Sequence, residues 1–337
     1  EKTLDFGVTV DGVLLKDDGV TATGTSSFTN ATITTADING GTMDDVAIGV
    51  TTSAAGTFAT MTSAAATITG GTIADTDVDV TGQGADDVKK DGKHLVIKSM
   101  MAGFEFMGGK PRGIALRCLN EIPHGRGLGS SAAAIVGGLS LSRSLVLSGS
   151  NLMSDDDLIA LATDIEGHPD NIAAATLGGA TISWMEDRAK VLTGCASGFS
   201  VDPNIRALLF IPDSQLSTGK ARKMLPEQIS HSDASINSGR SALLVHALSS
   251  RPELLFAATQ DLLHQSYRRE AMPKSIDLVN KFRKAGVAAM ISGAGPSVLV
   301  LHTATKAEHD DLIRSGGDYF KAMDLEISPT GVRIAAV

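Results

Sequence analysis

The chain has 337 residues and a mass of 34.8 kDa, with 42% hydrophobic and 20% charged residues. This composition argues against a wholly disordered chain, no apolar run reaches the roughly 18 residues of a membrane span, and two cysteines cannot form a disulfide framework. The net charge of −9 argues against general electrostatic binding of nucleic acid. Two cysteines fit a reducing compartment, so we expect a cytoplasmic protein without nucleic-acid or membrane partners.

The charge is concentrated in the first quarter of the chain. Residues 1–80 contain two basic residues, Lys2 and Lys16, and eleven acidic ones, a balance of 2 − 11 = −9, so the remainder is neutral overall. All ten prolines lie from Pro111 onward. This abrupt change predicts two unrelated pieces of chain, joined near residues 81–86.

The first piece is rich in Thr, Ala, Gly, Asp and Val, and short β-prone bursts alternate with Gly-Gly pairs. The octapeptide that begins at Ile38 recurs loosely from Ile68, 68 − 38 = 30 residues later. Such spacing predicts a stacked or solenoidal β-repeat over residues 1–81, and a flexible low-complexity segment is the alternative. The stretches over 12–20 and 49–58 resemble repeats of phage tail-fibre proteins, which implies a trimer if the segment is a fibre.

The second piece shows the wider hydrophobic spacing of amphipathic helices, interrupted by strands. In chain order, the pattern predicts a helix over 94–107, a strand over 113–119, helices over 130–146 and 155–165, a strand over 207–211, helices near 219–225, 236–249 and 251–266, and a strand–turn–strand over 290–301. This alternation predicts an α+β fold in two halves, divided near residues 200–206.

A glycine-rich turn lies between the strand over 113–119 and the next helix, with the sequence Pro-His-Gly-Arg-Gly-Leu-Gly-Ser-Ser-Ala from Pro123 to Ala132. Glycines allow backbone N–H groups to approach a ligand closely, and the helix N-terminus that follows favours phosphate. No Gly-Lys-Ser/Thr closes the loop, so it is not a Walker A loop. The alternative is a plain turn with a serine N-cap.

Two further elements carry polar or glycine-rich turns. Acidic residues, a histidine and an Asp-Asn pair lie at and beyond the end of the predicted helix over 155–165, from Asp164 to Asn171. On such a turn, carboxylates can reach a metal or a substrate hydroxyl, or they can cap the next helix. The third element is the glycine turn within the predicted strand–turn–strand over 290–301.

Together these elements resemble the GHMP kinases. The family's Pro-x-x-x-Gly-Leu-Gly-Ser-Ser-Ala-Ala motif matches from Pro123 to Ala133, and its glycine-rich turn matches from Ser292 to Ser297. The stretches over 166–171, 217–226 and 261–268 resemble homoserine kinases in particular. The resemblance implies an N-terminal ATP-binding domain over 82–205, an incomplete ribosomal S5 domain 2-like fold, and a ferredoxin-like C-terminal domain over 206–337.

The resemblance also implies the activity, namely transfer of the γ-phosphoryl group of ATP to L-homoserine in threonine biosynthesis. ATP would be bound by Pro123, Gly125, Arg126, Gly127, Leu128, Gly129, Ser130, Ser131 and Ala132. Mg²⁺ would be held by Ser131 (or Ser130) and Glu166, with Asp164 as the second choice. Homoserine would contact His168, Asp170, Thr218, Arg222, Arg268, Gly293 and Gly295. Among these residues, Asp170, Arg222 and Glu166 are the expected catalytic residues, and Asp170 is expected to orient the substrate rather than to act as a base.

The sequence departs from the family in its first quarter. GHMP kinases begin with a motif of the type Pro-x-x-x-Ala-Asn-Leu-Gly-Pro-Gly-Phe-Asp, and residues 1–81 contain no matching sequence. A natural fusion, a recombination product and an assembly error would each produce this arrangement. The alternatives to an active homoserine kinase are a fibre-like protein with an inactive kinase remnant and another GHMP kinase. A homodimer is the expected assembly if the first piece is not a fibre.

Overall fold

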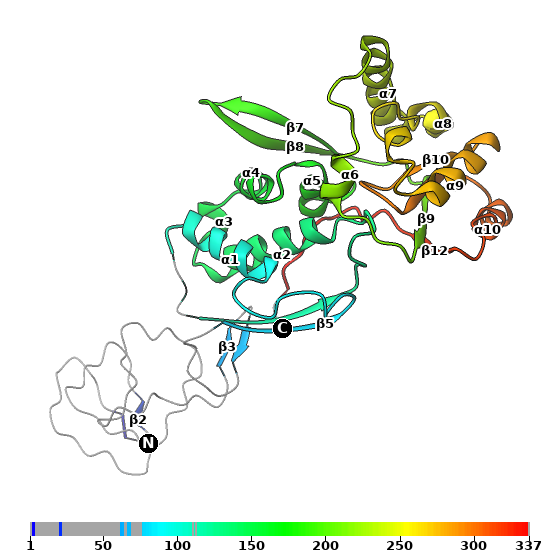
Figure 1. The fold of residues 1–337 in the computed structure, drawn as a ribbon. Coiled ribbons are helices and arrows are strands. Elements are labelled where there is room, and N and C mark those ends of the chain that lie inside the picture. The colour runs from blue at the N-terminus through cyan, green and yellow to red at the C-terminus, as the bar shows by residue number, and fades with distance from the viewer. Residues whose placement is uncertain are drawn as a thin grey trace. The chain divides into compact units, whose positions relative to one another are not determined.

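The computed structural model describes residues 76–109, 111 and 113–335, together with four short strands nearer the N-terminus, drawn in colour within the grey trace of Figure 1. These strands are β1 (Lys2–Thr3), β2 (Val20–Thr21), β3 (Met61–Ser63) and β4 (Ala66–Ile68). The predicted β-repeat over 1–81 lies largely outside the described residues and stays a prediction. The chain divides into the units Glu1–Gly56 and Thr57–Val337, and the description below concerns the second.

The first half of this unit opens with a strand–helix–strand arrangement. Strand β5 (Thr76–Gly82) pairs in parallel with β6 (Ile114–Asn120), and α1 (Leu95–Phe106) connects them. The side chains of Val78 and Val80 are buried in one cluster with residues of α1 and β6, as the period-two pattern of a strand requires. Because β5 pairs with β6 along its whole length, we propose that the kinase part begins no later than Thr76 rather than at residue 82.

Four helices and a hairpin complete this half. The helices are α2 (Ser130–Leu145), α3 (Gly149–Leu152), α4 (Asp155–Glu166) and α5 (Asp170–Leu177). A capping box between Ser154 and Asp157 starts α4, and Gly167 ends it with a left-handed backbone. Strands β7 (Ala180–Arg188) and β8 (Val191–Phe199) form an antiparallel hairpin that extends beyond the helices in Figure 1.

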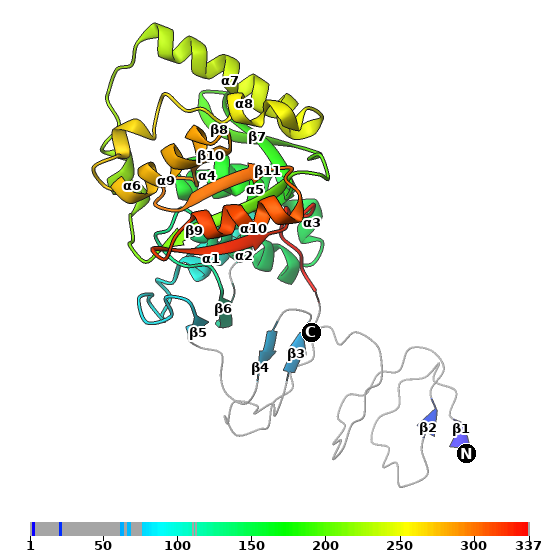
Figure 2. The ribbon, with the colours of Figure 1, turned by 90° about the vertical axis from the view of Figure 1, so that its right-hand side faces the viewer.

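The second half contains a four-stranded antiparallel sheet in the order β10-β11-β9-β12. Its strands are β9 (Arg206–Pro212), β10 (Ala288–Ile291), β11 (Val298–His302) and β12 (Phe320–Leu325). With α9 (Pro273–Lys284) and α10 (Lys306–Ser315), they give the β-α-β-β-α-β order of a ferredoxin-like fold. Figure 2 looks onto α10 where it lies over the sheet. The α+β prediction is therefore confirmed.

Further helices lie between β9 and α9. They are α6 (Thr218–Arg222), α7 (His231–Ser249), α8 (Leu255–Ala258) and the 3₁₀ helices η1 (Pro252–Leu254) and η2 (Ser266–Arg268). The prediction of one helix over 251–266 is wrong beyond Ala258. The Asp261 carboxylate accepts hydrogen bonds from the backbone N–H groups of Leu263 and His264, which competes with helical pairing.

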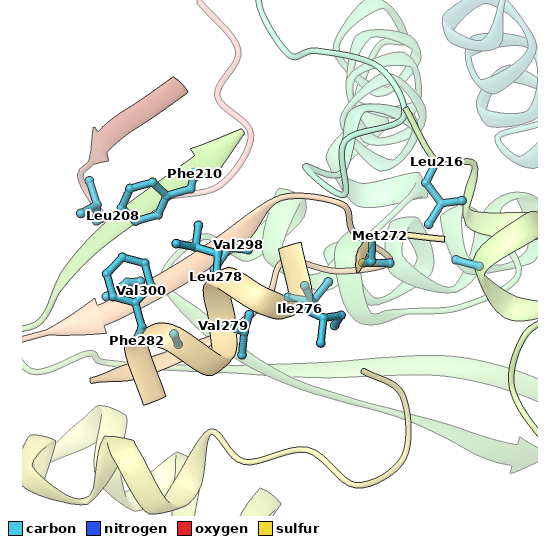
Figure 3. Packing of buried hydrophobic residues seen from close by; sticks show 13 residues of the cluster. Leu208, Phe210, Leu216, Met272, Ile276, Leu278, Val279, Phe282, Val298 and Val300 are labelled. Carbon is cyan, nitrogen blue, oxygen red and sulfur yellow. The ribbon is translucent and has the colours of Figure 1, made fainter. Parts of the chain in front are cut away.

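Both faces of the antiparallel sheet are covered. On one face, Phe210 and Val300 pack against α9, and the rings of Phe210 and Phe282 lie 5.2 Å apart (Figure 3). On the other face, Ala207 and Leu301 pack against residues of α7 and α8. Burial on both faces explains why β9 is buried at every position after Arg206.

The C-terminal segment runs back to the first half. The N–H of Gly179 donates to the carbonyl of Ser328 at 2.7 Å, and the N–H of Val332 donates to that of Ala175 at 2.9 Å. A Cβ atom on Gly178 would lie 2.2 Å from the backbone of Thr330, so glycine is required at this contact. These bonds join the two halves just after the end of β12. In the part of the chain that the structure describes, no helix is long and apolar enough to cross a membrane.

Candidate active site

A cavity of about 1560 Å³ lies between the two halves. This is more than the roughly 300–1,000 Å³ of a typical small-molecule pocket, so it offers room for two substrates. Most of the predicted site residues line it: Pro123, Gly125, Gly127, Leu128, Gly129, Ser130, Ser131, Glu166, His168, Asp170, Thr218, Arg222, Arg268 and Gly293.

The glycine-rich turn forms one wall of the cavity. Gly125, Gly127 and Gly129 all have a left-handed backbone, with φ of 62°, 73° and 72°. Gly129 is the N-cap of α2, so the first backbone N–H groups of that helix have no intrahelical partner. Free N–H groups and the positive end of the helix dipole together provide a site for phosphate.

The glycine-rich turn also touches the glycine turn of the second half. The Ser292 hydroxyl donates to the Gly127 carbonyl at 2.9 Å, and the Ser297 N–H donates to the Arg126 carbonyl at 3.3 Å. A Cβ atom on Gly127 would lie 2.2 Å from the Ser292 carbonyl oxygen. Glycine is therefore needed here for the approach of two backbones, in addition to any approach of a ligand.

Three predicted site residues do not line the cavity: Arg126, Ala132 and Gly295. The Arg126 guanidinium donates to the carbonyls of Pro212 and Asp213 at 2.8 and 2.6 Å, so it fastens the loop to the end of β9. Ala132 is 1% exposed and lies in the core around α2 and α4. A Cβ atom on Gly295 would collide with the side chains of Met272 and Ile291, so this glycine packs against buried residues.

Oxygen ligands gather beside the start of α2. The Ser131 hydroxyl donates to Glu166 Oε1 at 2.5 Å, although the two residues are 35 positions apart. Asp164, the second-choice ligand, is exposed and does not line the cavity. One hydroxyl and one carboxylate suit Mg²⁺, which prefers hard oxygen ligands and takes its others from phosphate and water. The donor set therefore fits this ion.

The turn after α4 places His168 and Asp170 at the cavity. The Asp170 carboxylate is hydrogen-bonded to Nδ1 of His168, and Nε2 of His168 lies 4.0 Å from Glu166 Oε1. Because an ionised carboxylate can only accept, Nδ1 of His168 carries the proton of that bond. The imidazole thus has a fixed orientation toward the cavity.

Two arginines among the predicted site residues, Arg222 and Arg268, bring positive charge to the cavity. Arg268 is 7% exposed, and its Nη1 donates to the Gly293 carbonyl at 3.2 Å. Burial lowers the pKa of Arg268, the charge of Asp261 opposes that effect, and the nearby Arg222 adds to it. Within the described residues, neither arginine forms an ion pair. Both are therefore suited to an anionic ligand.

Sequence reasoning assigned no role to several residues that line the cavity: Asn171, Asn237, Arg240, Asp261, His264 and Gln265. Asn171 directly follows the assigned Asp170, so its position was a usable signal. Asp261 and His264 contact each other within one turn. The contacts of Asn237 with Leu262 and of Gln265 with Ile291 span 25 and 26 positions along the chain. Such contacts leave no local pattern in the sequence.

Comparison with known proteins gives consistent matches. The family model for the GHMP kinases N terminal domain matches residues 94–179, and that for GHMP kinases C terminal matches residues 240–315. A homoserine kinase of Streptomyces avermitilis is 45% identical over 255 residues, which cover 75% of this chain and 81% of the relative. A homoserine kinase of Mycobacterium tuberculosis is 44% identical over 247 residues, 73% of this chain and 78% of the relative.

The fold also matches solved structures. The crystal structure of a homoserine kinase from Cytophaga hutchinsonii aligns with a TM-score of 0.62 and 24% identity, covering 76% of this chain and 83% of that one. At this identity the match supports the architecture alone. The two halves therefore belong to a fold that is found in a solved structure.

Proposed function

The chain belongs to the homoserine kinases of the GHMP kinase family, and from this premise we propose that it transfers the γ-phosphoryl group of ATP to the side-chain hydroxyl of L-homoserine. The product would be O-phospho-L-homoserine, a precursor of threonine. The observation that carries the proposal is the cavity itself, which is lined both by a turn suited to phosphate and by two arginines without ion-pair partners among the described residues.

The ATP phosphates are bound by the turn from Gly125 to Ser131. The backbone N–H groups at the start of α2 donate to phosphate oxygens, and the left-handed glycines keep Cβ atoms out of the way. The Arg126 guanidinium donates to carbonyls at the end of β9. Arg126 therefore holds the loop in place and does not itself contact ATP. Mg²⁺ would be held by Ser131 and Glu166, where it would neutralise charge that develops on the phosphate oxygens.

Homoserine is bound by a second set of residues that line the cavity. Arg222 and Arg268 bind its carboxylate, for which paired guanidinium groups are well suited. His168, Asp170 and Thr218 orient the hydroxyl end of the substrate toward the phosphates. Phosphoryl transfer passes through a loose transition state that mainly requires positioning, so Asp170 can orient the hydroxyl without acting as a base.

The test is a product assay with the protein in amounts sufficient to detect slow turnover. ATP and L-homoserine should yield ADP and a phosphate monoester that ³¹P NMR identifies as O-phosphohomoserine. α-Aminobutyrate, which lacks the hydroxyl, should give no phosphate ester. Phosphorylation of mevalonate or galactose in place of homoserine would support another GHMP activity, and no nucleotide binding at all would support an inactive remnant.

A further inference from the structure

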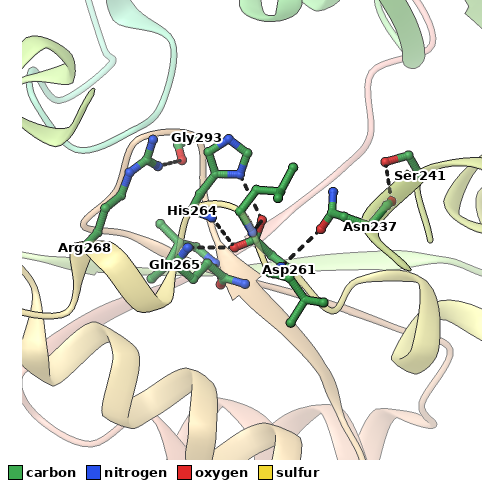
Figure 4. Close-up of polar contacts among 10 residues, drawn as sticks. Asn237, Ser241, Asp261, His264, Gln265, Arg268 and Gly293 are labelled. Carbon is green, nitrogen blue, oxygen red and sulfur yellow. Dashed lines mark hydrogen bonds and ion pairs between the residues drawn. The ribbon is translucent and has the colours of Figure 1, made fainter. Parts of the chain in front are cut away.

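The segment between α8 and η2 forms a tight turn centred on one carboxylate. Oδ2 of Asp261 accepts from the N–H groups of His264 and Gln265 at 2.9 and 2.6 Å. Its Oδ1 accepts from the N–H of Leu263 at 3.2 Å and from Nδ1 of His264 at 2.9 Å (Figure 4). Four donors therefore converge on a single side chain.

These hydrogen bonds keep Asp261 ionised. Burial by itself would raise its pKa, but the bonds from the His264 side chain and from the backbone of Gln265 and His264 lower the pKa to about 2. At neutral pH the carboxylate is a permanent acceptor, so the turn is held in one conformation. The amide oxygen of Asn237 on α7 also accepts from the N–H of Leu262 at 3.1 Å, which ties the turn to that helix.

Gln265 in this turn and Arg268 on η2 both bond to the backbone at the start of the glycine turn. Oε1 of Gln265 accepts from the N–H of Ile291 at 2.7 Å, at the end of β10. Nη1 of Arg268 donates to the Gly293 carbonyl at 3.2 Å, two residues further on. Gln265 and Arg268 thus bind both ends of the same short stretch of backbone.

The position of the Arg268 side chain depends on these two hydrogen bonds to the backbone of residues 291–293. Its side chain is buried, and its Nε has no hydrogen-bond partner among the described residues. A buried guanidinium with one free N–H can donate a hydrogen bond to an anion. The direction of that bond is defined only if the other contacts of the guanidinium hold its plane in place. The contact with Gly293 is such a restraint, and Gln265 holds the backbone that provides it.

We propose that Asp261 and Gln265 are positioning residues that fix Arg268 against the Gly293 carbonyl and so set the affinity for the substrate carboxylate. This inference rests on the proposed function for its ligand. A purely structural role would predict a loss of folding stability that affects ATP and homoserine equally. A positioning role predicts a selective loss of homoserine affinity that requires Arg268.

The test is a double-mutant cycle in the full chain, with affinities for homoserine and ATP measured by calorimetry. Gln265→Met keeps the side-chain length but removes the acceptor, and it should weaken homoserine binding about 3–10-fold, the loss expected for one neutral hydrogen bond. ATP affinity should change less than about twofold. In an Arg268→Ala background, Gln265→Met should have little further effect, because the residue through which it acts is gone.

Asp261→Asn is the second variant and should also weaken homoserine binding selectively, since one amide oxygen cannot accept four donors. The matched control is Asp202→Asn, because Asp202 also accepts a backbone N–H two residues on, from Asn204, but lies outside this cavity. It should leave both affinities unchanged. Additive effects of Gln265→Met and Arg268→Ala would overturn the inference.

A crystal structure of Gln265→Met separates this inference from the proposed function. If the unaltered chain binds no homoserine, the proposed substrate is wrong. The crystal structure still tests whether Gln265 holds Arg268 in place. Arg268 should lose its contact with the Gly293 carbonyl in the variant. An unchanged contact would refute the positioning role whatever the substrate.

Discussion

Arg222 and Arg268 carry the substrate assignment at the scale of single residues. Each lines the cavity, and Arg268 is buried with an N–H group free among the described residues. Arg222→Ala and Arg268→Ala should each weaken homoserine binding about 10–100-fold, as expected for a lost charge-assisted hydrogen bond of roughly 1.5–3 kcal/mol. Calorimetry should show ATP affinity nearly unchanged. A loss of ATP affinity with homoserine affinity intact would place these arginines on the nucleotide instead.

A buried histidine pair predicts the pH dependence of stability. Nδ1 of His302 accepts from the Ala304 N–H at 3.0 Å, its Nε2 lies 3.0 Å from Nδ1 of His309, and His309 Nε2 lies 3.4 Å from Asp324. Burial lowers the pKa of His302, and the neighbouring His309 and Arg206 lower it further, whereas the charges of Asp324 and Glu308 oppose this. The pair is therefore satisfied in its neutral form.

Stability should fall as the pH drops below about 6.5, the ordinary value for histidine. The unfolded chain binds more protons than the folded one between that value and the lower folded-state pKa of His302, so protons favour unfolding there. His302→Asn keeps an acceptor for the Ala304 N–H and should flatten this slope in urea unfolding between pH 5 and 7.5. His231→Asn, at an exposed histidine, should leave the slope unchanged. An unaltered slope in His302→Asn would exclude the pair as its source.

At the scale of elements, the turn before α2 should be sensitive to its backbone conformation. Gly129 has φ of 72°, and a Cβ atom there would make only an ordinary contact with Asn171, so strain rather than collision is the expected effect of Gly129→Val. A valine with this left-handed backbone costs about 1–2 kcal/mol. If ATP binding requires that backbone conformation, the affinity for ATP should fall about 5–30-fold.

The matched control is Gly286→Val, because Gly286 has φ of 80° and open space around it but does not line the cavity. Both variants should lose stability in thermal unfolding, and only Gly129→Val should lose ATP affinity. Equal ATP affinities for Gly129→Val and the unaltered chain would remove this turn from the nucleotide site.

Elements with local signals could be predicted from the sequence, and others could not. The helix α4 has a capping box and a terminal glycine, and both are visible in the sequence. The hairpin β7–β8 turns through Ala189 and Lys190, which both have positive φ without the usual glycine or asparagine, so no turn signal was present. The spacing of apolar residues predicts a helix over 259–265. It does not reveal that the Asp261 carboxylate accepts the backbone N–H groups of the residues that follow it.

The same distinction holds for the site. The glycine-rich turn that the sequence predicts as a phosphate loop lines the cavity. Arg126 within it does not, because carbonyls 86 and 87 residues later accept its N–H groups. Gln265 received no role, since its partner Ile291 is 26 residues away. Residue type and local spacing identify which segments form a site, and long-range hydrogen bonds decide which way each side chain points.

At the scale of the whole molecule, the first half has apolar surface that its described elements leave uncovered. The hairpin β7–β8 pairs with no further strand in the described part of the chain, and Val191 and Leu192 on it are 61% and 60% exposed. Leu119 on β6 is 70% exposed. Exposed apolar strands favour aggregation and weaken the packing that holds nearby loops in place. The family's first motif, which residues 1–81 do not contain, belongs to this half.

The chain should therefore be a slow kinase, and a family front segment should accelerate it. Phosphoryl transfer depends on positioning, and misplacement by about 1 Å can cost roughly 10²-fold in rate. In a chimera, residues 1–75 are replaced by the first segment of the Streptomyces avermitilis homoserine kinase, with β5 kept intact because it pairs with β6. The kcat/KM for homoserine should rise about 100-fold, whereas a chain that begins at Thr76 should stay as slow as the unaltered one. Equal activity of the unaltered chain and the chimera would show that residues 1–75 already supply what the motif supplies in its relatives.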